Sequence, residues 1–113
     1  MAEDRIAEIV SMQQQEYEEL LANLIVHFYR PGYDMFCLNL RDKNRLSLMR
    51  FIVMLNAKFK ATGKIVPLLK IAGESIEAQG GFVLSNGAET IDCTLETLLK
   101  EHEAILLDSM PKA

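Results

Sequence analysis

The spacing of apolar residues in the first quarter of the chain is the strongest constraint on its fold. They recur at three- and four-residue steps, the repeat of one helical face, and comprise Ile6, Ile9, Val10, Tyr17, Leu20, Leu21, Leu24, Ile25 and Phe28. This spacing predicts one helix over about residues 3–28. At a rise of 1.5 Å per residue the helix would be about 40 Å long, whereas a small domain is about 30 Å across. We therefore expect its acidic first half to protrude from the body.

A turn at residues 31–32, Pro-Gly, should end this helix, because proline interrupts helical hydrogen bonding and glycine permits a chain reversal. Residues 35–38 are a short apolar run, which predicts a strand buried on both faces. A second helix is predicted over residues 43–61, with Asp42 or Asn39 as its cap. Apolar residues cover more than one face of this helix, so we expect it to be heavily packed.

The second half of the chain predicts mostly β-structure. Residues 65–71 are a strand candidate in which Pro67 cannot donate a ladder hydrogen bond, which favours a sheet edge or a bulge. Residues 81–84 and 89–93 flank the dipeptide Asn86-Gly87. Asn-Gly between two apolar runs predicts a β-hairpin, because both residue types tolerate positive φ.

A final helix is predicted after Thr94, which can cap it. Its apolar stripe consists of Leu95, Leu98, Leu99, His102, Ile105 and Leu106. The complete order, α-β-α-β-β-β-α, predicts an α+β fold: a small mixed sheet of about four strands, helices packed on it and a long protruding N-terminal helix. The strand-helix-strand unit should cross over between parallel neighbours. At 113 residues the chain suits a single domain, 1–113, in which a stalk-type helix (1–30) leads into an α/β head (31–113).

The charge pattern and hydropathy limit the classes of partner. The net charge is −4, and the acidic residues are concentrated at the start of the chain. Basic residues cluster only modestly and have no interleaved aromatic residues, so we do not expect nucleic-acid binding. No signal peptide is recognisable, and no apolar run approaches the roughly 20 residues of a membrane span. We expect a cytoplasmic protein with no direct membrane insertion.

The chemistry-bearing residues form no recognisable catalytic, cofactor or metal motif. Cys37 and Cys93 lack a CxxC partner and should be buried free thiols. His27 and His102 lie near apolar stripes, where histidines are usually half-buried and hydrogen-bonded. The pair 80–81, Gly-Gly, is outside any phosphate-binding pattern and should permit a tight strand entry. We therefore expect no enzymatic activity, no cofactor and no small-molecule substrate. A thiol enzyme that pairs either cysteine with either histidine stays open as an alternative, because two such residues can be neighbours in the fold although they are far apart in the sequence.

The predicted overhang calls for a binding partner. Ile6, Ile9 and Val10 would face water if nothing covered them, and a partner helix would shield them. A frayed helix end, or a helix that bends back onto the body, is the alternative.

Residues 80–106 carry a resemblance to a known family. They read GGFVLSNGAETIDCTLETLLKEHEAIL and resemble the C-terminal signature of the E subunit of V/A-type rotary ATPases. The glycines at 80–81 match a glycine pair in that signature, and residues 92–96 match an Asn/Asp-Cys-Ser/Thr-apolar-acidic run that opens the final helix. Segments 4–10, 16–26, 38–46 and 55–64 are similar to the upstream segments of the family in their order, so the resemblance spans nearly the whole chain.

The resemblance implies a non-catalytic head of the peripheral stalk, or stator. Such a head binds the partner stalk subunit, G or H, and the N-terminal β-barrel of the B subunit. It resists rotor torque in a complex that transports protons or sodium ions, and it is cytoplasmic and peripheral to that membrane-bound complex. Family members carry a long polar helical arm before the point that corresponds to the start of this sequence, and the sequence departs from the family pattern there. The ion and the direction of transport are not specified by a stalk subunit.

On this interpretation both terminal helices contact partners. The residues expected at the interface are Ile6, Ile9, Val10 and Gln13 on the first helix and Leu98, His102 and Ile105 on the last. The alternative is a self-associating α/β module without a rotary role, in which the apolar overhang closes a homodimer.

Overall fold

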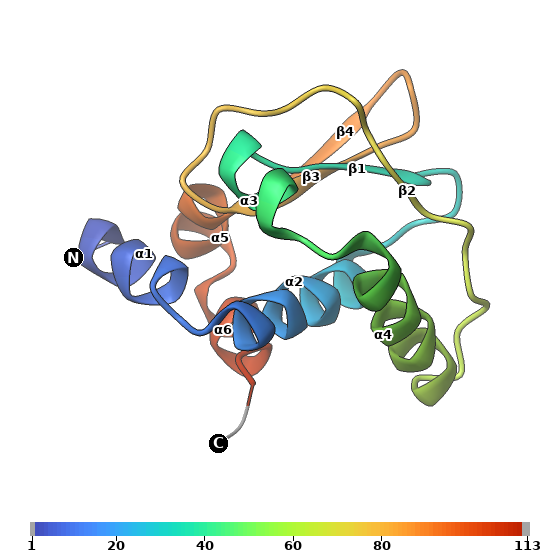
Figure 1. Ribbon diagram of the computed structural model, residues 1–113, viewed down its shortest axis with the longest axis horizontal. Helices are drawn as coiled ribbons and strands as arrows, with labels where there is room; N and C mark the ends of the chain where they lie inside the picture. Colours follow the sequence, from blue (N-terminus) through green and yellow to red (C-terminus); the bar gives the residue numbers. More distant parts are fainter. Residues whose placement is uncertain (1, 112–113) are drawn as a thin grey trace.

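A four-stranded mixed sheet with strand order β2-β1-β3-β4 organises the fold (Figure 1). The computed structural model describes residues 2–111. The strands are β1 (Met35–Cys37), β2 (Lys70–Ile71), β3 (Gly81–Ser85) and β4 (Thr90–Thr94). β1 pairs in parallel with β2 and antiparallel with β3, which pairs antiparallel with β4. The predicted mixed sheet of about four strands is confirmed, whereas Met1, Lys112 and Ala113 of the predicted domain lie outside the described residues.

The predicted long N-terminal helix is instead two helices, α1 (Ala2–Val10) and α2 (Gln14–Phe28). Residues 11–16 contain one apolar residue, Met12, so a continuous helix would have had a gap in its apolar face. The chain turns there, and the hydroxyl of Ser11 donates a hydrogen bond of 3.0 Å to the Glu8 carbonyl. The expectation of a straight 40 Å rod is therefore wrong.

α1 folds back onto the chain's own body. It packs against α5 (Leu95–Glu101), which lies beside it in Figure 1. Ile6 and Ile9 are only 2% and 1% exposed, and both belong to the main hydrophobic core. The predicted protrusion is therefore wrong. The chain's own core removes the apolar surface of these side chains from water, so no partner is needed to cover it.

The predicted second helix is also divided, into α3 (Leu40–Arg45) and α4 (Leu48–Ala61). Asn39 is the cap of α3, since its side-chain oxygen accepts a hydrogen bond of 2.7 Å from the Asp42 amide. α4 packs against α2, and Phe51, Leu55 and Phe59 on its inner face are all buried. The opposite face is exposed, so the heavy packing expected on more than one face is wrong.

The last predicted helix is interrupted at His102, whose φ and ψ of −142° and 41° are not helical. It therefore consists of α5 and α6 (Glu103–Asp108). This change of direction lets Leu98 and Leu106, which are both buried, reach the core from two short helices. The prediction of one continuous helix is wrong. Thr94 does occupy the N-cap position of α5, but its hydroxyl makes no capping hydrogen bond and instead donates one of 2.7 Å to Asp92.

The predicted hairpin is confirmed as β3-β4, with Ser85 opposite Thr90. Its connection has four residues, 86–89, and only the glycine at 87 has a positive φ, of 94°. The Asn86 side-chain oxygen instead accepts hydrogen bonds from the Ala88 and Glu89 amides, at 2.8 and 2.6 Å. Asparagine therefore stabilises the turn through its side chain rather than through a left-handed backbone.

One face of the sheet forms the core, and the other is partly open. Phe36, Phe82 and Leu84 are fully buried on the inner face, together with Cys93. Met35, the neighbour of Phe36 in β1, is 41% exposed, so the prediction that β1 is buried on both faces is wrong. β2 is at the edge of the sheet, as predicted, but it contains only Lys70 and Ile71 of the strand expected over residues 65–71, and Pro67 lies before it.

Candidate functional site

The glycine pair at the start of β3 belongs to a buried packing arrangement. Tyr17 donates a hydrogen bond of 2.6 Å to Asp42 and accepts one of 3.0 Å from the Gly81 amide. A Cβ atom on Gly80 would lie 2.6 Å from Leu95 Cδ1 and 2.9 Å from the Tyr17 hydroxyl. Burial, and then the charge of Asp42, raise the pKa of Tyr17. The expected structural role of these glycines, a tight strand entry, is confirmed.

The two cysteines are free, and neither is activated as a nucleophile. Cys93 is fully buried, and burial followed by the nearby charge of Asp92 raises its pKa to about 12. Cys37 is half-buried rather than buried, and burial followed by the charge of Glu74 raises its pKa too. A catalytic thiol needs the opposite shift, because the thiolate is the reactive form. The structure therefore argues against the thiol-enzyme interpretation.

The two histidines differ from their predicted setting. Both are exposed rather than half-buried. Each meets the ring of Phe28 edge-on, with ring centroids 5.0 Å apart for His27 and 5.4 Å apart for His102. These contacts link the end of α2 to the junction between α5 and α6. The histidines thus have a packing role.

The described part of the chain holds neither a metal-ligand cluster nor a membrane-spanning helix. Within residues 2–111, no group of three or more His, Cys, Asp and Glu side chains is arranged to hold a metal ion. Over the same residues, no helix has both the length and the apolar character needed to span a bilayer.

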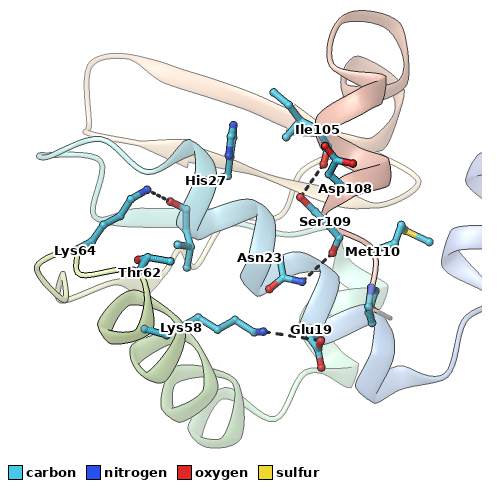
Figure 2. A pocket seen from close by; sticks show the side chains of 13 residues that line it. Glu19, Asn23, His27, Lys58, Thr62, Lys64, Ile105, Asp108, Ser109 and Met110 are labelled. Carbon is cyan, nitrogen blue, oxygen red and sulfur yellow. Dashed lines mark hydrogen bonds and ion pairs between the residues drawn. The ribbon is translucent and has the colours of Figure 1, made fainter. Parts of the chain in front are cut away.

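A groove of about 730 Å³ is present among the described residues (Figure 2). It lies between α2, the end of α4, and α6 with the segment that follows it. Its lining residues are Glu19, Asn23, Val26, His27, Lys58, Ala61, Thr62, Lys64, Ile105, Asp108, Ser109, Met110 and Pro111.

Hydrogen bonds across the groove tie its walls together. Asn23 donates a hydrogen bond of 2.8 Å to the Ser109 carbonyl, which attaches the C-terminal segment to α2. Lys64 donates one of 2.6 Å to the carbonyl of Val26, at the end nearer the sheet.

Sequence reasoning found one of the groove residues, Ile105, as an interface candidate. It missed Asn23, Ser109 and Lys64. The bond between Asn23 and Ser109 joins residues 86 positions apart. No local pattern marks such a pair, because each residue is an ordinary polar position in its own segment.

The structure places the predicted interface residues in three environments. Ile6, Ile9 and Leu98 are buried in the chain's own core, so the argument that these isoleucines face water does not hold. Val10 and Ile105 are half-buried. The polar members, Gln13 and His102, are exposed. Their contact with a partner stays a prediction.

Comparison with known proteins identifies relatives along nearly the whole chain. The chain is 30% identical over 112 residues to the E subunit of the V-type ATP synthase of Clostridium botulinum (strain Langeland), a match that covers 96% of this chain and 55% of that protein. It is 31% identical over 90 residues to the E subunit of the V-type ATP synthase of Acetivibrio thermocellus, covering 80% of this chain and 44% of that protein. The E subunit of a V-type proton ATPase of Clostridium botulinum (strain Okra) is also 30% identical over 112 residues.

No protein-family model matches the chain, and no solved structure matches it. The chain spans about half the length of the curated relatives that it matches. The resemblance drawn from residues 80–106 is confirmed, and nearly all of this chain is homologous to about half of the E subunit of V-type ATP synthases.

Proposed function

We propose that this chain is the non-catalytic head of a peripheral stalk in a V-type rotary ATPase or ATP synthase. In this role it binds the partner stalk subunit, G or H, and the B subunit of the catalytic head, and it resists rotor torque during proton or sodium transport. It works in the cytoplasm, peripheral to the membrane-bound complex. The observation that carries the proposal is the 30% identity to the E subunit of a V-type ATP synthase over 96% of the chain.

The physical character of the site supports a binding role. The glycine pair and Tyr17 are committed to packing, and the thiols are held in their protonated form. A stator head needs firm attachment of its parts rather than a reactive group. Arg50 Nη2 donates to both carboxylate oxygens of Glu18, at 2.9 and 3.1 Å, and this contact joins α4 to α2 and provides such an attachment.

We place the contact with the stalk partner at the end of the molecule formed by α1, α5 and α6. The residues available there are Gln13 and His102, which are exposed, and Val10 and Ile105, which are half-buried. Ile6, Ile9 and Leu98 act from within the core by holding α1 against α5. The groove beside Ile105 extends this surface towards α4.

Mixing the purified chain with the C-terminal segment of the G or H stalk protein, and separately with the N-terminal β-barrel of the B subunit, tests the proposal. We expect complexes by size-exclusion chromatography and calorimetry. The double substitution of Gln13→Glu and Ile105→Ser should weaken binding of the stalk segment. The control substitution Thr90→Ser, on the exposed part of β4, should not.

Absence of a complex with both partners would refute the proposed role. If the mass of the chain instead rises with its own concentration and does not change when these partners are added, the chain is a self-associating module.

A further inference from the structure

The outward face of α4 is apolar although no part of the described chain covers it. Met49 is 84% exposed and Val53, one turn later, is 70% exposed. Ala57 and Lys60 continue the row at helical spacing and are also exposed. We call these four residues the α4 stripe. It lies on the side of the helix opposite the buried row that begins at Phe51.

The connection that follows α4 has the same character. It runs from the end of the helix back to β2 (Figure 1). Ile65 is 91% exposed and Leu68 is 80% exposed. Large apolar side chains that are this exposed, and grouped along one helix and the segment after it, are typical of surfaces that bind another macromolecule.

The segment that carries this surface has basic residues but no acidic ones. Residues 43–73 contain no Asp or Glu. Their basic residues are Lys43, Arg45, Arg50, Lys58, Lys60, Lys64 and Lys70. In the described part of the chain, only two of these form ion pairs: Arg50 with Glu18 at 2.9 Å and Lys58 with Glu19 at 3.9 Å. The segment that carries the apolar residues is therefore cationic, and most of its basic side chains form no ion pair with a described carboxylate.

We propose that the α4 stripe, together with Ile65 and Leu68, docks an acidic protein segment that carries apolar side chains. Apolar contacts would supply most of the affinity, and the lysines and arginines would select an anionic partner and speed its association. This surface is separate from the end formed by α1, since α1 and α4 lie on opposite sides of α2 in Figure 1. The inference is independent of the proposed stator role.

Two other occupants fit the surface less well. A symmetric dimer through the α4 stripe would place the same basic residues opposite one another, because both copies contribute the same patch. A membrane surface is usually bound through aromatic side chains at the interface. The aromatic residues of α4, Phe51 and Phe59, are instead fully buried.

The test uses the full chain and a defined probe, a labelled synthetic peptide of about 18 residues with Leu at helical spacing and Glu elsewhere. We expect saturable binding by fluorescence anisotropy. Val53→Glu and Met49→Glu should each weaken it at least about tenfold, and so should replacing the leucines of the peptide with serine. Raising the salt concentration from about 0.05 M to about 0.5 M should weaken it further. Leu107→Ser, which changes an apolar residue of α6 that is 41% exposed, is the matched control and should not alter binding.

Several results would overturn the inference. The inference is wrong if the peptide does not bind at concentrations up to about 1 mM, which corresponds to a negligible affinity. It is also wrong if the peptide binds and neither Val53→Glu nor Met49→Glu weakens the binding. Co-sedimentation with phosphatidylserine vesicles that depends on Val53, without peptide binding, would identify a membrane site instead. A concentration-dependent mass that Val53→Glu abolishes would identify a second copy as the occupant. Because the peptide is not a rotary-ATPase component, failure here leaves the proposed stator role untouched.

Discussion

Replacing Gly81 with alanine should destabilise the protein strongly, because the position is constrained in two independent ways. Its φ is 87°, a left-handed conformation that costs a residue with a Cβ atom about 1–2 kcal/mol. The added Cβ would also lie 2.4 Å from the Cys93 carbonyl oxygen and 2.8 Å from the Leu95 amide nitrogen. Both neighbours are backbone atoms, so no side-chain rotation relieves the contact.

Relief would require a shift of β3 relative to β4, and this shift would cost more than the strain alone. Forced overpacking of a buried site typically costs about 1–3 kcal/mol. The shift would also stretch the 3.0 Å hydrogen bond from the Gly81 amide to Tyr17, whose net value is about 1 kcal/mol. We expect a total loss of about 3–6 kcal/mol, a large part of the 5–15 kcal/mol that stabilises a typical domain.

Gly87→Ala is the matched control. Gly87 has a similar φ of 94°, but a Cβ atom there would meet nothing within 4 Å. Its substitution should therefore cost only the conformational strain, about 1–2 kcal/mol. Urea unfolding of the two variants, followed by circular dichroism, measures the difference. If the two variants lose the same free energy of unfolding to within about 0.5 kcal/mol, close backbone packing is not the reason for a glycine at position 81.

Two further predictions concern buried titratable groups. Tyr17→Phe leaves the Gly81 amide without its hydrogen-bond acceptor and Asp42 without a hydrogen-bond donor. We therefore expect the free energy of unfolding, measured in urea, to fall by about 2–3 kcal/mol. Tyr33→Phe is the control: it removes an exposed hydrogen bond and should be nearly neutral. Burial raises the pKa of Cys93 from 9.0 to about 12, so the unfolded chain releases this proton first. Its contribution to stability is complete below pH 9 and is lost as the pH rises from 9 towards 12, at up to about 1.4 kcal/mol per pH unit. Cys93→Ala should flatten this decline in unfolding experiments between about pH 8 and 10.5, and equal slopes for the two proteins would contradict the assignment.

Several features of the fold were predictable because they depend on residues close together in the chain. The hairpin followed from Asn86-Gly87 between two apolar runs, and the side chain of Asn39 was recognisable as a helix cap. The edge position of β2 was predicted, but the strand expected over residues 65–71 is only Lys70–Ile71, so Pro67 lies outside it. Each of these signals acts within a few residues, so no knowledge of the remaining chain was required.

The helix boundaries were predicted less well, because a helical repeat shows which face is apolar but not where the axis changes direction. The apolar positions before and after residues 11–13 fit one continuous face, yet the chain turns there and α1 packs on α5. The same error occurred at His102. Ile6 and Ile9 were predicted as interface residues because a straight helix would have exposed them, whereas the turn between α1 and α2 allows them to be buried.

The amino-acid sequence by itself determined the types of element, their order and the relationship to the E subunit of V-type ATP synthases, because periodicity, turn chemistry and residue identity are local properties. Only the tertiary structure decided which apolar helix faces are buried against other segments of the chain. It buried Ile9 and left Val53 exposed, although both occupy apolar positions of an amphipathic helix. The physical reason is that burial depends on which distant segments meet a given face, and this depends on the directions that all the helices take together.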